Sequence, residues 1–245
     1  MEKKIKARLK EILQKTQKMV PKETSEKPSE KTPENARAEY LSEVLRMHRI
    51  YVENFHKAME DGEYAELTPG GCCATLRYKD LAGVDLRCVN LRLSHLEGSN
   101  FEGANFINAN LSITKLYDAK FNKAILIKAN FSHSNAEGAE FIGADLRGGT
   151  LNSTDLTDAV FRNADLSFAN LDEAKLIGAD LTNVKLIGAE LKQVKLRGAN
   201  LTNADFTGAD LTEADLRGAI LTGANFTGAI LTDIKLDVTV DELIK

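Results

Sequence analysis

Leucine or phenylalanine recurs at every fifth position of the chain from Leu76 to Leu236. These 33 positions hold 24 Leu, 8 Phe and a single exception, Ala136. Two residues before nearly every one stands a small or β-branched side chain, usually Ala, with Lys79 as the charged exception. A helix buries every third or fourth residue and a strand every second, so a strict period of five fits neither element.

A repeated short extended piece followed by a corner fits this period. It points two side chains of every five inward, one large and one small, so that the interior can interdigitate. The remaining positions are rich in Asp, Asn, Thr, Lys, Arg and Gly, which suit solvent and turns. Backbone groups can then pair with the coils above and below at ~4.8 Å. The sequence therefore predicts an all-β solenoid over residues 74–238.

Three successive units show the repeat most clearly: Ala199-Asn200-Leu201-Thr202-Asn203, Ala204-Asp205-Phe206-Thr207-Gly208 and Ala209-Asp210-Leu211-Thr212-Glu213. They resemble the A(D/N)LXX unit of the pentapeptide-repeat proteins. The resemblance implies a right-handed quadrilateral β-helix with four units, or 20 residues, per coil. The chain would then form about eight coils, roughly 40 Å long at the strand spacing. Many relatives interrupt their coils with functional loops, but no loop interrupts residues 74–238.

One unit departs from the pattern inside the repeat. Ala136 replaces a large inward side chain, so we expect a local deficit of core volume unless Phe131 and Phe141 fill it.

The segments that flank the repeat are expected to cover its ends, because an open end would expose apolar side chains and unpaired backbone. Residues 35–73 are predicted to hold an N-terminal helix and cap, with an amphipathic helix over 36–61; a partner-binding helix is the alternative. Residues 239–245 are predicted to form a C-terminal cap. In gyrase-protecting relatives this cap also forms a dimer, which leaves a homodimer open here.

The first 34 residues differ from the repeat in composition. Residues 22–34 hold Lys, Glu, Ser, Thr and Pro with no apolar side chain, which predicts a disordered linker. Residues 1–21 are a candidate basic amphipathic helix, with seven basic and two acidic residues before position 21. Such a segment could be solvated on its tether, lie on an anionic membrane surface, join a coiled coil or dock on a partner.

A 20-residue period assigns outward positions to faces. The whole chain carries a net charge of −4, and acidic residues are concentrated on one predicted face. They are Asp172, Glu173, Glu190, Asp210, Glu213 and Asp233. The next face gathers basic residues: Lys175, Lys195, Arg197, Arg217 and Lys235. We call these sets the acidic stripe and the basic stripe. A DNA mimic of the kind that gyrase-protecting relatives represent should show one sign over most of its surface, so adjacent stripes argue against that function.

A third predicted face is apolar: Ile107, Ile125, Ile127, Phe168 and Ile187. We expect the first three to cluster on adjacent coils, and an exposed cluster of this kind marks a contact surface. The N-terminal helix folding back is the alternative cover.

Catalysis finds no support in the sequence. The four His lack a Ser or Cys partner in a recognisable motif, and no phosphate-binding Gly loop or zinc-ligand pair is present. The recurrent Asp and Asn before each large inward residue indicate a solvating, structural role. We therefore expect no enzyme activity, no cofactor, no metal and no direct binding of nucleic acid.

Cysteine usage and hydropathy bear on the compartment. Cys72, Cys73 and Cys88 lack disulfide or metal spacing, which suits a reducing compartment. No apolar run reaches ~18 residues and no signal core begins the chain, so we expect a cytoplasmic protein. We also expect a bacterial source. The interpretation favoured is a non-enzymatic scaffold that binds a protein partner. A DNA-mimicking modulator of gyrase or topoisomerase and a membrane-surface adaptor are the alternatives.

Overall fold

The computed structural model describes residue 39, residues 41–46 and residues 74–237. The chain divides into two compact units, Met1–Thr75 and Leu76–Lys245. In the first unit, residue 39 and residues 41–46 are helical, which agrees with part of the helix expected over 36–61. Leu41 is buried there, and Arg46 pairs with Glu43 one turn earlier at 2.6 Å. The cap function of this helix, the basic segment 1–21 and the linker 22–34 lie outside the described residues.

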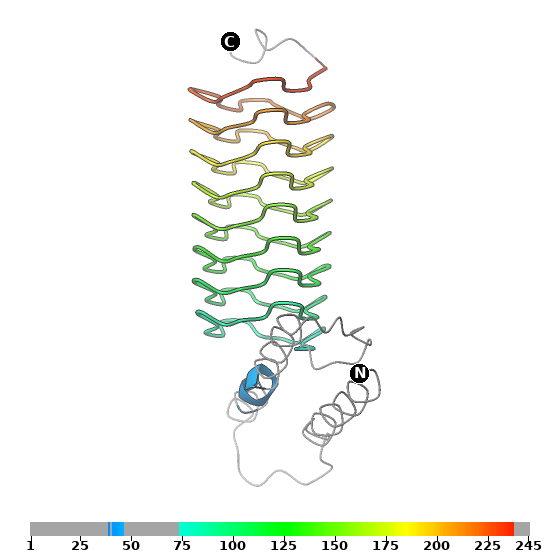
Figure 1. The fold of residues 1–245 in the computed structure, drawn as a ribbon, viewed down its shortest axis with the longest axis vertical. Helices are drawn as coiled ribbons and strands as arrows, with labels where there is room; N and C mark the ends of the chain where they lie inside the picture. Colours follow the sequence, from blue (N-terminus) through cyan, green and yellow to red (C-terminus); the bar gives the residue numbers. More distant parts are fainter. Residues whose placement is uncertain (1–38, 40, 47–73, 238–245) are drawn as a thin grey trace, which may run out of the picture. The chain divides into compact units, whose positions relative to one another are not determined.

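The second unit is a stack of coils that repeat every 20 residues (Figure 1). Parallel bridges join residues 20 apart at every fifth position, from the pair Asp80 and Asn100 to the pair Asp215 and Lys235. Between coils, the N–H of Leu86 donates to the carbonyl of Asn105 at 2.7 Å, and this contact recurs along the stack. Each coil thus has four five-residue sides, as the resemblance to pentapeptide-repeat proteins implies.

A tight turn forms each corner. The N–H of Ala104 donates to the carbonyl of Phe101 at 3.0 Å, and Gly103 between them has a φ of 65°. A positive φ recurs at every fifth residue from Tyr78 to Asp233, as at the third residue of a type II turn. Glycine meets this demand without steric cost, yet many of these positions carry other residues, so the coil imposes the conformation on them.

Ile113 is the residue least suited to its corner. It is β-branched, it has a φ of 55°, and 40% of its surface is exposed. Ile113→Gly should therefore raise the free energy of unfolding by about 1 kcal/mol, because left-handed backbone costs an L-residue roughly that much. Urea denaturation of both proteins measures the change. The reverse substitution, Gly208→Ala at a φ of 67° with no atom near the new Cβ, should lower stability.

Large inward side chains fill the coil. Phe101, Phe121, Phe141 and Phe161 stack on one another through successive coils, with ring centroids 5.1, 5.1 and 4.7 Å apart and planes within 16°. Phe131 and Phe141, which flank Ala136 in the sequence, meet edge to face at 6.0 Å. Phe121 and Phe131, which flank Leu126, make a similar contact at 5.8 Å, so this contact is not specific to the unit with the short side chain.

Four hydroxyl groups at the small inward position donate to the backbone of the coil before. Thr114 donates to the carbonyl of Leu91 at 3.0 Å, Ser134 to that of Leu111 at 2.6 Å, and Thr154 to that of Phe131 at 2.8 Å. Ser99 makes the same bond to Leu76. Each acceptor lies 23 residues earlier. Among the described residues Ser94 is the exception at this position, because its buried hydroxyl has no hydrogen-bond partner.

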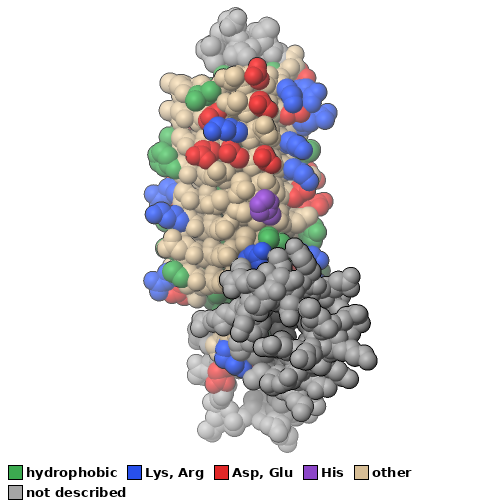
Figure 2. All heavy atoms as spheres, viewed as in Figure 1, with side chains coloured by type: hydrophobic (Ala, Val, Ile, Leu, Met, Phe, Trp, Pro, Cys, Tyr) green, Lys and Arg blue, Asp and Glu red, His purple; other side chains and the backbone are tan. Residues whose placement is uncertain are grey.

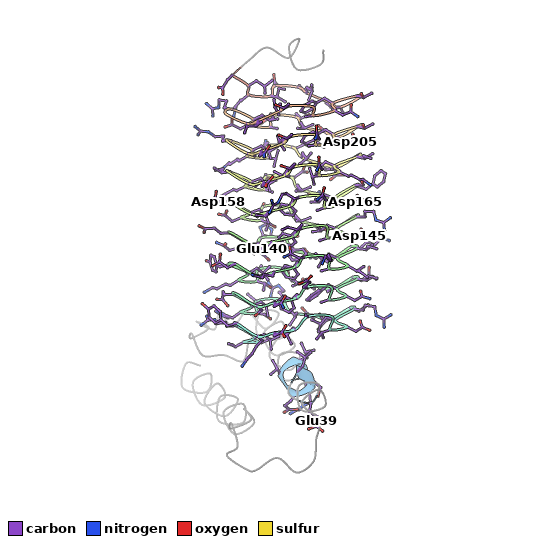
Figure 3. All side chains as sticks on the ribbon, turned by 180° about the vertical axis from the view of Figure 1, so that it is seen from behind. Glu39, Glu140, Asp145, Asp158, Asp165 and Asp205 are labelled. Carbon is purple, nitrogen blue, oxygen red and sulfur yellow. The ribbon has the colours of Figure 1, made fainter. Side chains whose placement is uncertain are left out.

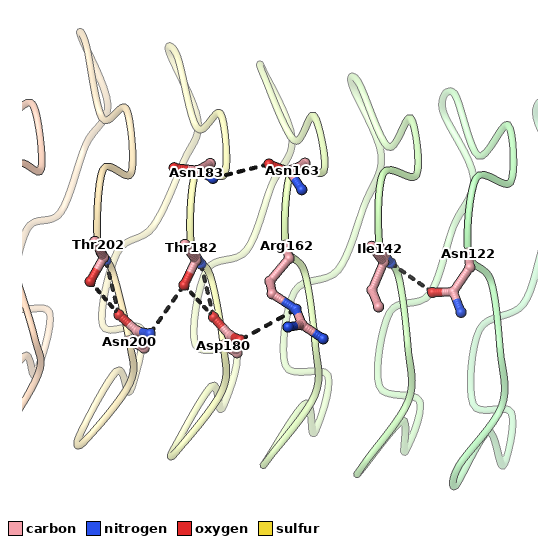
Figure 4. Close-up of polar contacts among 9 residues, drawn as sticks. All are labelled: Asn122, Ile142, Arg162, Asn163, Asp180, Thr182, Asn183, Asn200 and Thr202. Carbon is pink, nitrogen blue, oxygen red and sulfur yellow. Dashed lines mark hydrogen bonds and ion pairs between the residues drawn. The ribbon is translucent and has the colours of Figure 1, made fainter.

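Outward side chains also connect the coils (Figure 4). An amide ladder runs from Asn163 through Asn183 to Asn203, with each amide donating to the previous one at 3.1 Å. On the same side, Asn200 donates to the hydroxyl of Thr182 at 3.0 Å. These bonds lie between residues 18 or 20 apart, so they reinforce the register that the backbone sets.

The last described coil is less well covered than the others. The inward side chains of Leu221, Leu231 and Leu236 are half-buried, whereas Leu201 and Leu211 are fully buried. The cap expected over residues 239–245 lies outside the described residues.

Candidate functional site

The coil brings the first three residues of the apolar set together. Ile125 lies beside Asn105 of the previous coil, and the N–H of Asn108 donates to the carbonyl of Ile127 at 3.0 Å. Ile107 and Ile127 are therefore neighbours on adjacent coils. Ile125 is 39% exposed, while Ile107 and Ile127 are half-buried. We call these three residues the isoleucine patch.

A charged pair borders the isoleucine patch at each end along the coil axis. On the N-terminal side of the patch, Nε and Nη2 of Arg87 donate to the carboxylate of Asp85. On the C-terminal side, Nε and Nη2 of Arg147 donate to the carboxylate of Asp145 in the same way. The bridges place both aspartates in the column of Ile125. Hydrogen bonds from the guanidinium groups hold the pKa of each aspartate below its usual value. The patch is thus an apolar centre with a polar rim of fixed charges.

The other two members of the apolar set lie apart from the isoleucine patch. The N–H of Phe168 donates to the carbonyl of Ile187 at 2.9 Å, and the Phe168 ring lies over Gly188. Phe168 is 71% exposed. The coil that carries Asp145 and Arg147 separates this pair from Ile127. Asp145, Asp165 and Asp205 line the same side (Figure 3).

The acidic stripe occupies the next side of the coil, where successive bridges align Glu190 with Asp210. Figure 2 shows a side on which acidic side chains gather next to a line of Lys and Arg. Polar neighbours reduce the negative charge of the acidic stripe. Nδ2 of Asn170 donates to Oε2 of Glu190 at 2.6 Å, and Nζ of Lys192 lies 3.4 Å from Oδ2 of Asp210. A hydrogen bond from the Thr212 hydroxyl is the main cause that lowers the pKa of Asp210.

The basic stripe follows across a corner. Lys175 pairs with Asp155 at 2.9 Å, and Lys195 lies in the same column on the next coil. An open groove of about 520 Å³ runs between the two stripes, lined by Ser153, Glu173, Lys175, Gln193, Lys195, Glu213, Asp215 and Lys235.

Asp215 is the most perturbed acid of the groove. Two hydrogen bonds from Arg217, at 2.8 and 2.6 Å, lower the pKa of Asp215 from 3.8 to about 2. Because the folded-state pKa is depressed, the pair stabilises the coil above about pH 4, and this contribution disappears as the pH falls toward 2. NMR titration of the carboxyl should give an apparent pKa near 2 in the native chain. In Arg217→Met the pKa should return toward the usual value, and an unchanged titration would contradict this cause.

Several exposed apolar residues escaped the sequence interpretation. Tyr78 is 79% exposed with its ring over Gly98, and Ile220 and Ile230 are about half exposed. All three stand at outward positions of the five-residue unit, so the period that identified the isoleucine patch could have identified them.

Metal and membrane sites find no support in the described residues. No group of three or more His, Cys, Asp or Glu is arranged to hold a metal ion among residues 39, 41–46 and 74–237. In the same part of the chain, no helix is long and apolar enough to span a bilayer.

The family model "Pentapeptide repeats" matches this chain in eight copies. The matched residues are 80–112, 114–152, 124–163, 139–176, 164–203 and 199–236, and several of these ranges overlap. The chain belongs to the pentapeptide repeat family. Members are generally structural or interaction proteins without catalysis, and no catalytic family is indicated for this one.

Solved pentapeptide repeat proteins of the right-handed β-helix type resemble the chain. HetL from Nostoc sp. strain PCC 7120, involved in regulating heterocyst differentiation, shares 28% identity over 64% of this chain and 87% of its own, with a TM-score of 0.47. QnrB1, a plasmid-mediated fluoroquinolone resistance protein, shares 23% over 66% and 89%, with a TM-score of 0.54. A thylakoid-lumen protein from Arabidopsis thaliana shares 33% over 41% and 72%, with a TM-score of 0.38. No curated protein matches significantly.

Proposed function

We propose that this pentapeptide repeat protein is a non-enzymatic scaffold that binds a protein partner through the isoleucine patch. The observation that carries the proposal is the placement of Ile107, Ile125 and Ile127 on adjacent coils, between the Arg87–Asp85 and Arg147–Asp145 pairs. An apolar centre with a charged rim is the usual anatomy of a protein interface.

The coil also favours binding by being ordered in advance. Every side of the patch is fixed by backbone bonds to the coils above and below, as in the 2.7 Å bond from Phe106 to Ile125. Binding of a partner to such a surface therefore costs little conformational entropy in this chain. The expected partner surface is apolar at its centre and presents carboxylates or carbonyls toward the two arginines.

A pulldown from the native host with the full chain tests the proposal. The double variant Ile107→Asp and Ile127→Asp should lose a partner that the native chain retains, because two carboxylates would lie desolvated at the centre of the contact. Thr207→Asp with Thr227→Asp is the matched control, since both stand at the same unit position on the same side. Circular dichroism checks that both variants stay folded, and calorimetry with the purified partner measures the affinity. Equal binding of the partner by the two variants would refute the proposal that the isoleucine patch is the binding surface.

A gyrase-directed DNA mimic is the second candidate. The acidic stripe and the shared fold with QnrB1 favour it, although at 23% identity that likeness concerns the fold alone. The adjacent basic stripe weakens it, because a duplex has one sign of charge along its length. A supercoiling assay with purified gyrase decides: inhibition or protection supports the mimic, and an inert result rejects it.

Membrane-surface attachment through residues 1–21 is a separate proposal that rests on the sequence of that segment. Sedimentation with anionic liposomes should pull down the full chain more than a chain that begins at residue 22. Equal partitioning of the two would rule the anchor out.

A further inference from the structure

The groove between the two stripes carries charges that have no partner in the part of the chain that the structure describes. Among the described residues, the side chains of Glu173, Lys195 and Lys235 make no hydrogen bond or ion pair, although all three line the groove. The stripes themselves run along the stacking axis, because bridges align Lys175 with Lys195 and the N–H of Glu173 donates to Lys192 of the next coil.

We infer that this groove is the contact surface of a side-by-side homodimer whose two coil stacks run parallel, with the two-fold axis along the groove. In a two-fold dimer each subunit presents the same surface to the other. A two-fold axis parallel to the stripes places the acidic stripe of one subunit against the basic stripe of its partner. A two-fold axis across the stripes would place like charges together, which is repulsive.

The level of each charge also fits the parallel arrangement. Glu173 and Lys175 lie at one coil level, Gln193 and Lys195 at a second, and Asp233 and Lys235 at a fourth. The two-fold axis keeps each level, so at the first and fourth levels an acid of one subunit faces the lysine of the other. At the second level Gln193, whose amide donates to Glu213 at 3.0 Å, faces Lys195. At the third level Glu213 would face Asp215, whose charge Arg217 already neutralises.

The contact is small and polar, so the dimer should be weak and sensitive to salt. Exposed ion pairs each contribute little, and their attraction is screened over a Debye length of about 10 Å at 0.1 M salt and about 3 Å at 1 M. The isoleucine patch lies outside the groove, so dimerisation leaves it free and does not depend on the proposed function.

Sedimentation velocity of the full chain over a concentration series tests the proposal. A dimer should form at 50 mM NaCl and dissociate at 500 mM. Lys195→Glu with Lys235→Glu makes both edges of the groove acidic, and Glu173→Lys with Asp233→Lys makes both basic. Each variant alone should associate on the order of tenfold or more weakly, because like charges then face each other. An equimolar mixture of the two should recover a heterodimer.

Lys128→Glu with Lys185→Glu is the matched control, because both lysines are exposed on the side of the isoleucine patch and the change in net charge is the same. It should dimerise like the native chain. Carbodiimide coupling of mixed ¹⁴N and ¹⁵N chains should give hybrid Asp233–Lys235 links, which an antiparallel dimer would not form. A chain that is monomeric throughout, or a dimer that both groove reversals leave intact, as one formed through the coil ends would be, overturns the inference.

Discussion

Phe141→Ala is expected to lower the free energy of unfolding by about 3–5 kcal/mol, the usual loss for a buried phenylalanine. The ring is fully buried between Phe121 at 5.1 Å and Phe161 at 4.7 Å, and its edge meets Phe131 at 6.0 Å. Ala136 stands nearby, so the truncated side chain would add to a site already short of volume. Denaturation in guanidinium, followed by circular dichroism, measures the loss.

Phe168→Ala is the matched control for this substitution. It removes the same atoms from a ring that is 71% exposed, so the transition midpoint should move little. If the two variants lost equal stability, the assignment of large residues to a packed interior would be wrong.

Ala164→Asp is the second substitution with a large expected effect. Ala164 is 1% exposed at the small inward position, and a carboxylate there would be surrounded by apolar side chains without a cation. Burial of an unpaired charge costs several kcal/mol, so the central coils should unfold or the carboxyl should stay protonated with a raised pKa. Thermal melts at pH 7 and pH 4 distinguish these results, because a protonated carboxyl is tolerated better at the lower pH.

Ala164→Ser controls for polarity and size at the same position. Its hydroxyl should donate to the carbonyl of Phe141, 23 residues earlier, as Thr154 donates to Phe131. We therefore expect a change of less than about 1 kcal/mol, the net value of a satisfied hydrogen bond. A serine as damaging as the aspartate would show that the small position tolerates no polar atom.

The fold could be predicted in detail because one period controls it. The fifth-residue spacing of Leu and Phe places each side chain inside or outside. The four units per coil, from which the 20-residue bridges follow, came from the resemblance to pentapeptide-repeat proteins. The phenylalanine stack was also accessible, since Phe101, Phe121, Phe141 and Phe161 stand 20 apart. The corner conformation was not, because residues such as Ile113 and Phe168 oppose a positive φ and only the tertiary structure imposes it.

The candidate surfaces were predictable to the level of columns but not of contacts. The period alone groups the acidic stripe, the basic stripe and the isoleucine patch. It also places Asp145 and Arg147 one coil beyond Ile125 and Ile127, before Phe168, but it could not foresee that these two charged side chains pair with each other. Nor could it assign Arg217 to Asp215, a choice that depends on rotamers and not on spacing.

The distance between two spin labels tests the 20-residue coil most directly. Glu137 and Arg217 are both exposed and occupy one column, four coils apart, so labels at these positions should lie about 19 Å apart along the axis. Labels at Glu137 and Thr207 are separated by ten fewer residues but occupy opposite sides, and should give the longer distance across the coil. Double electron–electron resonance on a chain with its native cysteines replaced measures both. A shorter distance for the second pair than for the first would contradict a coil that closes after four sides.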